Sequence, residues 1–265
     1  MAKDQSRASD NSSYLSPARP RVLAHRGLAV DVPENTMLAF AKAVATGAQY
    51  IETDVHASLD GAAVVAHDLS LTRVAGRDLK VEQLTMAELR RIDLGDGQGF
   101  CSLSEALDAF PETRFNIDVK SRGAVLPTVR AIRDLSATHR VLVTSFDEKR
   151  RAATVAHLPG VASSASARRF LVALLSAKTG ISPATRRALS GLVAIQVPEK
   201  ALGLRVTTQR MIQRVHALGL EMHVWTINEP QRMRHLFDLG VDGIVTDRAD
   251  LALEVVDSRA QPGSA

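Results

Sequence analysis

The sequence is poor in the residues that mark small secreted domains or membrane proteins. Cys101 is the only cysteine among 265 residues, so the chain can form neither an internal disulfide nor a thiolate metal cluster. A lone cysteine agrees with a reducing compartment, and we expect a cytoplasmic location. The longest apolar runs, such as 170–175, are far shorter than the roughly 20 residues that a membrane-spanning helix needs.

Aromatic residues and net charge are also low. Aromatics make up 4% of the chain, and 33 Lys and Arg against 29 Asp and Glu leave a formal net charge of +4. No basic stripe with interleaved aromatics is present, so we expect no nucleic-acid partner. A hydrophobic content of 45% is too high for a disordered chain. The length suits either two small domains or one large α/β barrel.

The two ends differ in composition from the rest. Residues 1–20 are polar and rich in Ser, Asp and Pro, and they lack the apolar stretch of a secretory signal. We expect a disordered tail over 1–20 and a flexible tail over 257–265. No linker divides residues 21–256, which favours a single domain.

Short Val, Ile and Leu-rich runs alternate with stretches of helical spacing, which predicts βα units, a mostly parallel sheet and a TIM (β/α)8 barrel. The expected strands are 22–25, 50–55, 62–66, 115–119, 141–144, 161–164, 193–197, 222–225 and 243–246. The expected helices are 34–46, 82–91, 103–110, 124–135, 147–157, 167–178, 183–190, 207–218 and 229–239.

Nine expected strands are one more than such a barrel has, and a hairpin turn at Asp60-Gly61 would explain the extra strand. This dipeptide is a strong signal for a two-residue hairpin turn. If 51–59 and 62–67 pair antiparallel around it, Leu59 faces Ala62 and Asp54 faces His67. We therefore expect a somewhat irregular barrel with an extra hairpin or insertion at the C-terminal rim. The alternative is that 62–66 is a barrel strand and one later run is not.

Charged and polar side chains collect where these strands end. In a parallel barrel the carboxyl ends of all strands meet at one rim, which predicts a shared site there. Any one of these residues could be a turn former, a cap or half of a surface ion pair, but their coincidence at one rim favours function. The candidates are His25, Arg26, Glu52, Asp54, His67, Asp118 and Lys120.

The spacing of the carboxylates predicts a metal. Glu52 and Asp54 are two residues apart in one strand, so both project to the same face, and Asp118 ends a later strand. An all-oxygen set of this kind suits Mg²⁺ or Ca²⁺, with Mn²⁺ as a further candidate, rather than zinc. Arg and Lys beside a cation suit a phosphoryl group, and two histidines suit proton transfer. The set is typical of phosphodiester cleavage.

At these residues the sequence resembles the glycerophosphodiester phosphodiesterase family, in the right order over nearly all of 22–250. The matching segments are His25-Arg26-Gly27, Pro33-Glu34-Asn35-Thr36, Ile51-Glu52-Thr53-Asp54-Val55, Asp60-Gly61, Val64-Val65-Ala66-His67-Asp68, Leu71-Thr72-Arg73, Asn116-Ile117-Asp118-Val119-Lys120, Ser145-Phe146, Val224-Trp225-Thr226-Ile227-Asn228 and Gly240 to Asp247.

The resemblance implies a TIM barrel and metal-dependent hydrolysis of glycerophosphodiesters to glycerol 3-phosphate and an alcohol, within lipid and glycerol metabolism. It implies three metal ligands and two acid/base histidines, with the remaining positions binding substrate. The ligands would be Glu52, Asp54 and Asp118, the histidines His25 and His67, and the substrate-binding residues Arg26, Lys120, Glu34 and Trp225. One position departs from the family, which usually has Glu where Asp118 stands.

Residues 165–190 match the family least. A barrel helix with a buried apolar stripe is the simpler interpretation. The alternative is weak contact of 168–178 with a membrane surface through Phe170 and Leu174, because basic residues flank the apolar ones. Two other functions stay open: a lysophospholipase D or sphingomyelinase-D-like phosphodiesterase, and a non-catalytic barrel that binds metal or phosphate.

Overall fold

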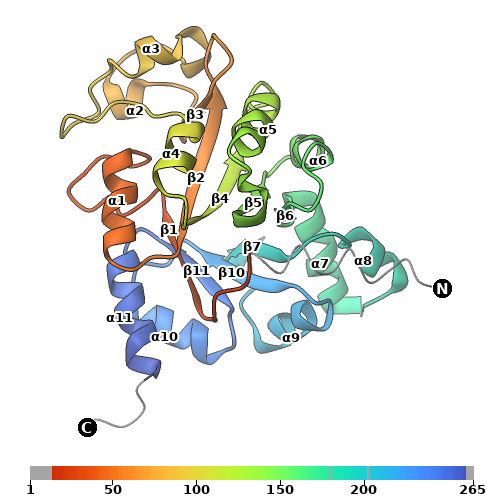
Figure 1. The fold of residues 1–265 in the computed structure, drawn as a ribbon. Helices are drawn as coiled ribbons and strands as arrows, with labels where there is room; N and C mark the ends of the chain where they lie inside the picture. The colour runs from red at the N-terminus through yellow and green to blue at the C-terminus, as the bar shows by residue number, and fades with distance from the viewer. Residues whose placement is uncertain (1–13, 180, 202, 261–265) are drawn as a thin grey trace.

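Eight parallel strands form a nearly closed barrel, as the alternating pattern predicts (Figure 1). The computed structural model describes residues 14–179, 181–201 and 203–260. The sheet order is β6-β5-β4-β2-β1-β11-β10-β7, and a parallel bridge between Ser164 and Ala194 joins its two edges. The strands are β1 (Arg21–His25), β2 (Tyr50–Ala57), β4 (Arg114–Val119), β5 (Val141–Thr144), β6 (Ala162–Ser163), β7 (Ala194–Pro198), β10 (Glu221–Trp225) and β11 (Gly243–Thr246).

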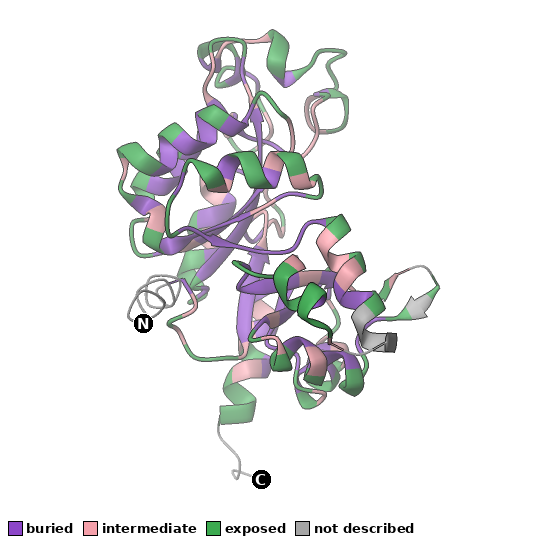
Figure 2. Ribbon diagram, turned by 90° about the vertical axis from the view of Figure 1, so that its right-hand side faces the viewer, coloured by how far each residue is buried: buried purple, intermediate pink, exposed green. Residues whose placement is uncertain are grey.

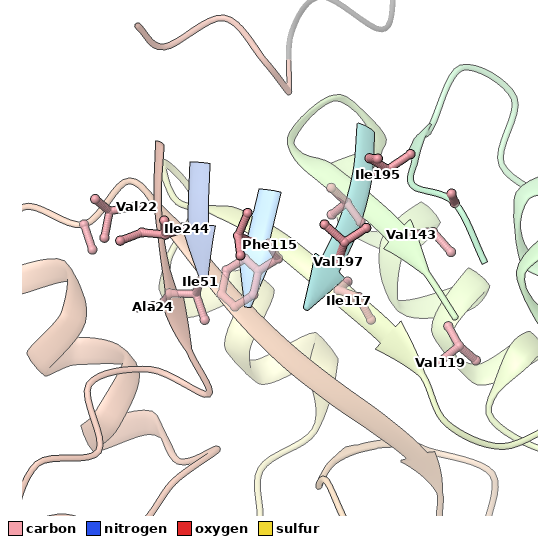
Figure 3. Close-up of a cluster of buried hydrophobic side chains, with 14 of the residues drawn as sticks. Val22, Ala24, Ile51, Phe115, Ile117, Val119, Val143, Ile195, Val197 and Ile244 are labelled. Carbon is pink, nitrogen blue, oxygen red and sulfur yellow. The ribbon is translucent and has the colours of Figure 1, made fainter. Parts of the chain in front are cut away.

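Helices surround the barrel and pack on its outer face. The outward-facing strand residues, among them Val22, Ile51, Phe115 and Ile195, form the larger hydrophobic core between strands and helices (Figure 3), and Figure 2 shows the buried strands beneath helices with exposed outer faces. These helices are α1 (Met37–Ala45), α4 (Leu103–Ala109), α5 (Val125–Asp134), α6 (Glu148–Ala156), α7 (Ala167–Thr179), α8 (Pro183–Ala188), α9 (Gln209–Ala217), α10 (Pro230–Asp238) and α11 (Ala249–Ala260). No helix among the described residues is long and apolar enough to cross a membrane.

The extra strand β3 (Ala63–Val65) pairs antiparallel with β2, outside the barrel. The hairpin prediction is confirmed, but its register is wrong by one residue, because Val55 faces Val65 and Ser58 bonds to Ala62. A two-residue type I′ turn needs positive φ at both central residues, whereas here only Gly61 of the pair has it, at +79°. The loop therefore has three residues, and Ala66, not His67, lies opposite Asp54.

An insertion over residues 66–102 follows β3, at the top of Figure 1 and away from α7–α11. It holds α2 (Thr72–Ala75), the 3-10 helix η1 (Val81–Gln83) and α3 (Met86–Leu89) around a small core that includes Leu71 and Phe100. The helix predicted over 82–91 is therefore split, because Leu84 is extended and Thr85 starts a new helix with a capping box to Glu88. Three short elements lie elsewhere, namely the 3-10 helix η2 (Ala137–Arg140) and the paired strands β8 (Lys200–Ala201) and β9 (Leu204–Arg205).

Two further boundaries differ from the predictions. Helix α1 begins at Met37 rather than residue 34, since Asn35 has a φ of +55° and Thr36 is the N-cap whose side chain accepts from Ala39 N. Helix α11 was not predicted, and it extends into the segment expected to be a flexible tail from 257. Its Ala252 and Val255 are buried, so the helix packs on the outer face of the barrel after the last strand, β11. Residues 261–265 lie outside the described part.

The N-terminal segment also differs from the expected tail over 1–20, of which 1–13 lie outside the described residues. Tyr14 is 1% exposed, and its ring packs edge-on against Tyr50, 5.3 Å between centroids. The Arg21 guanidinium donates to the carbonyls of Leu15 and Pro17 at 2.8 and 2.6 Å. These contacts hold the segment across the amino-terminal end of the barrel.

Tyr14→Ala should lower the free energy of unfolding by about 3 kcal/mol or more, because it removes a fully buried aromatic ring. Tyr14→Phe should change it by less than about 1 kcal/mol, because the Tyr14 hydroxyl has no hydrogen-bond partner among the described residues. Urea unfolding of the two variants measures both values. Equal free energies of unfolding for Tyr14→Ala and the parent would show that the N-terminal segment does not stabilise the barrel.

Candidate active site

A cavity of about 390 Å³ opens at the carboxyl ends of the strands. Eight of the nine residues singled out from the sequence line it, so the shared rim predicted from the strand ends exists. They are His25, Arg26, Glu52, Asp54, His67, Asp118, Lys120 and Trp225. The ninth, Glu34, lines an adjoining cavity of about 250 Å³ that shares His67 with the first.

The turn after β1 fixes the direction of Arg26. Arg26 has a φ of +56° and Gly27 a φ of +86°, and a Cβ on Gly27 would come within 2.7 Å of the Ala39 backbone. Glycine is therefore required there for close packing of α1. The backbone of Arg26 bonds to Glu52 O and Asn35 N at 2.8 and 2.9 Å, which ties this turn to β2.

Three carboxylates lie buried together at the mouth of the barrel. Glu52, Asp54 and Asp118 are 8%, 3% and 5% exposed. Burial, followed by the charge of Asp54, raises the pKa of Glu52 to about 8, and burial also raises the pKa of Asp118. Buried carboxylates in a low-dielectric setting favour cations beside them.

Unpartnered oxygens point to the same conclusion. Glu52 Oε2, Asp118 Oδ1 and Asn116 Oδ1 are buried without a hydrogen-bond partner in the described part of the chain. Asn116 is 2% exposed and lines the cavity two residues before Asp118. These oxygen atoms are the donor type that a hard divalent cation prefers.

The carboxylates do not enclose an ion as they stand. Among the described residues, no three His, Cys, Asp or Glu side chains converge on one metal position. Lys120 Nζ instead lies 3.1 Å from both Asp54 Oδ1 and Asp118 Oδ2, and Arg26 Nε is 3.3 Å from Asp54 Oδ2. Two protein cations therefore neutralise part of the buried negative charge.

His25 is held by a carboxylate from the last strand. Its Nδ1 is 2.6 Å from Asp247 Oδ1, and Asn228 Nδ2 donates to Asp247 Oδ2 at 2.7 Å. The Asn228 carbonyl in turn accepts from Asp247 N and Thr246 Oγ1. Burial lowers the pKa of His25, but the Asp247 hydrogen bond and the Glu52 charge outweigh it, so the pKa is raised. His25 Nε2 faces the cavity, 3.8 Å from Glu52 Oε2.

His67 has an equivalent arrangement built from the insertion. Its Nδ1 is 2.7 Å from Asp68 Oδ1, and Arg73 Nε donates to Asp68 Oδ2 at 2.5 Å. Arg73 Nη2 also donates to Glu34 Oε1 at 2.6 Å, and the same oxygen accepts from Arg26 Nη1 at 3.0 Å. Glu34 thus links the two sides of the site through arginines.

The opposite wall of the cavity is apolar. Phe146, Phe170 and Trp225 line it, and the Phe146 and Trp225 rings pack edge-on with centroids 6.1 Å apart. Lys120 Nζ lies 6.0 Å from the Phe146 ring centroid. The cavity therefore offers a charged side for a phosphate and an apolar side for the rest of a ligand.

Sequence reasoning missed four residues of this site. Asn116 is two positions before Asp118, and the same alternation that paired Glu52 with Asp54 could have found it. Asp68 directly follows His67, but adjacency alone does not show that their side chains bond. Asp247 and Asn228 follow the last two strands, β11 and β10, and only the folded barrel brings them to His25.

The comparisons with known proteins agree with this geometry. Residues 25–251 match the profile of the glycerophosphoryl diester phosphodiesterase family. The chain belongs to this family. A relative from Mycobacterium tuberculosis, named probable glycerophosphodiester phosphodiesterase 2, is 39% identical over 90% of this chain and 91% of its own.

Solved phosphodiesterase structures share the fold. A glycerophosphodiester phosphodiesterase from Agrobacterium tumefaciens superposes with a TM-score of 0.75 at 26% identity, covering 90% of this chain and all of its own. A phosphodiesterase from Oleispira antarctica, solved with the product sn-glycerol-3-phosphate, has a TM-score of 0.74 at 21% identity over 90% and 97%. The family assignment and the barrel predicted from the sequence are thus confirmed.

Proposed function

We propose that this protein hydrolyses glycerophosphodiesters to glycerol 3-phosphate and an alcohol, with a divalent cation and two acid/base histidines. The observation that carries the proposal is the pairing of each histidine Nδ1 with its own carboxylate, at one cavity that also holds three buried carboxylates and two cationic side chains. Family membership supports the same reaction.

The histidines move the protons. A carboxylate that accepts the Nδ1 proton leaves Nε2 as the reactive nitrogen, as in other oriented histidines. One of His25 and His67 takes a proton from the attacking hydroxyl or water, and the other gives a proton to the leaving alcohol oxygen. Arg26 and Lys120 bind the phosphate oxygens, where their charge offsets the negative charge that builds up during displacement.

Glu52, Asp54 and Asp118 would hold the cation, and the residues fit this role because their buried oxygens lack partners and burial raises the pKa of Glu52 and Asp118. When bound, Mg²⁺, Ca²⁺ or Mn²⁺ supplies positive charge that polarises the phosphoryl group. Lys120 lies between Asp54 and Asp118, where its positive charge offsets theirs beside the phosphate position.

Asp118 is one methylene shorter than the Glu usual at this position, and Asn116 compensates for it. The Asn116 amide oxygen projects to the same side of β4 as Asp118 and has no partner in the described residues. It would supply a further oxygen donor to a cation held by Glu52, Asp54 and Asp118. Glu34 and Trp225 bind the glycerol end, through a carboxylate and an apolar ring respectively.

The proposed reaction is tested by glycerol 3-phosphate release from glycerophosphocholine with Mg²⁺, Ca²⁺ or Mn²⁺ and with a chelator. The parent should be active only with a cation, and His25→Ala and His67→Ala should each lower kcat by about 10²-fold or more. Turnover that persists in the chelator would remove the cation from the proposal. A full rate in either histidine variant would remove that residue.

The same assay separates a second substrate class. Phe146, Phe170 and Trp225 form an apolar wall that could take a hydrocarbon chain, which favours lysophospholipids as an alternative. Higher kcat/KM for lysophosphatidylcholine than for glycerophosphocholine would assign the lysophospholipase D reaction instead.

Asp247→Asn should lower kcat by about 10²-fold with KM within about twofold, because an amide no longer fixes the His25 tautomer while the phosphate-binding groups stay in place. Asp250→Asn is the matched control, since Asp250 pairs with Arg248 and should leave both constants unchanged. A rise in KM without loss of kcat would show that Asp247 acts on substrate binding rather than on His25.

Calcium titration by calorimetry tests the ligand set without turnover. Asp118→Ala and Asn116→Ala should weaken binding, by tenfold or more and by about tenfold respectively, since each removes an oxygen donor. Gln196→Ala is the control, because Gln196 lies across the cavity on β7. Unchanged affinity in Asn116→Ala would exclude it from the cation site.

A further inference from the structure

Positive charge is concentrated in one segment of the chain. Residues 149–198 contain eight Lys and Arg and no Asp or Glu, whereas the whole chain has an excess of only four positive charges. The rest of the chain is therefore net negative. The segment runs from α6 through α7 and α8 to β7, so the positive charge covers one side of the barrel.

Some of the Lys and Arg side chains in this segment form ion pairs within the protein, and others face solvent. Arg151 and Arg169 both pair with Glu148 at 2.7 and 2.9 Å. Lys149, Arg168 and the adjacent pair Arg186 and Arg187 are exposed. These four side chains give the side a positive potential toward solvent.

Helix α7 adds an exposed apolar stripe to the same side. Leu171 and Leu175 are 43% and 54% exposed, and with Arg168 they occupy positions i, i+3 and i+7 on one face of the helix. The other face is internal, because Leu174 is 8% exposed and Phe170 lines the active-site cavity. Phe170 and Leu174, named from the sequence for the alternative of membrane contact, therefore face inward, as the simpler interpretation of a barrel helix expects.

The stripe adjoins the mouth of the cavity. Phe146 is 59% exposed and lines the cavity, and its carbonyl accepts from Ala167 N at 3.2 Å, where α7 begins. Seven large hydrophobic side chains are exposed among the described residues, and three of them, Phe146, Leu171 and Leu175, lie on these two neighbouring segments. Scattered single leucines need no explanation, but a group bordered by cations does.

We propose that this face, formed by Phe146, Arg168, Leu171 and Leu175, docks onto an anionic phospholipid surface. Exposed leucines enter the acyl boundary of a bilayer while flanking arginines contact the phosphate groups, and the absence of acidic residues from α7 and α8 limits repulsion from the anionic surface there. Docking in this way turns the cavity mouth toward the membrane. Lysophospholipids partition into such a surface, so docking would shorten their path to the site.

The test is co-sedimentation of the full chain with sucrose-loaded vesicles. This assay measures binding without turnover, so a negative result can be told apart from failure of the proposed hydrolysis. The parent should bind vesicles of phosphatidylcholine with 30% phosphatidylglycerol at least about tenfold more tightly than pure phosphatidylcholine. Leu171→Ser with Leu175→Ser, and separately Arg168→Glu, should each weaken that binding about tenfold or more. Raising the salt from 0.05 to 0.5 M should also weaken it, because screening shortens the reach of the charges.

Leu59→Ser with Leu126→Ser is the matched control, because these leucines are 64% and 57% exposed on the β2–β3 hairpin and on α5. This variant should bind vesicles as the parent does, and both leucine double variants should keep parental hydrolysis of soluble glycerophosphocholine. No binding of the parent to anionic vesicles, or equal loss in the control, overturns the proposal. A change in the protein's own sedimentation on Leu171 and Leu175 substitution would mean that a second copy covers the face, which overturns it as well.

Discussion

Mutual repulsion among three buried carboxylates is the constraint around which this site is arranged. Glu52, Asp54 and Asp118 come from two adjacent strands and lie almost out of contact with water. Burying such charges is costly unless cations or hydrogen-bond donors face them. Arg26 and Lys120 supply the cations, and Asn35 Nδ2 donates to Asp54 Oδ2 at 3.3 Å.

This arrangement explains why the first βα turn is unusual. Arg26 and Asn35 both contact Asp54, and both adopt left-handed backbone conformations, which cost free energy for residues with a side chain. Gly27 lets α1 pack against the turn and holds both residues in place. The negative charge of Asp54 on β2 is thus offset by residues of the turn that follows β1. The two strands are therefore linked by these side-chain contacts as well as by backbone hydrogen bonds in the sheet.

The strand ends were predictable from the sequence, and side-chain pairing across strands was not. Hydrophobic periodicity locates the alternating strands and helices, and with them the charged residues at strand ends, such as Asp54 and Lys120. Because all parallel strands of a barrel end at one rim, these residues could be expected to lie together. The hairpin register depends on the φ of Asp60, which a residue type does not determine. Burial of Tyr14 and the contact of Asp247 with His25 depend on segments far apart in the chain. The roles of the histidines, of Glu34 and of the ligand set stay predictions until the variants are measured.

The hydrogen bond between His25 and Asp247 joins residues 222 positions apart, on strands that lie side by side as the first and last of the barrel. A chain that ends before β11 contains Glu52, Asp54, Asp118 and both histidines but lacks Asp247, the carboxylate that bonds to His25 Nδ1. Bringing such distant residues together costs chain entropy, which only completion of the sheet offsets. With the role proposed for His25, hydrolysis requires the complete barrel, and a chain truncated before β11 that still binds a phosphodiester would release it without cleaving it.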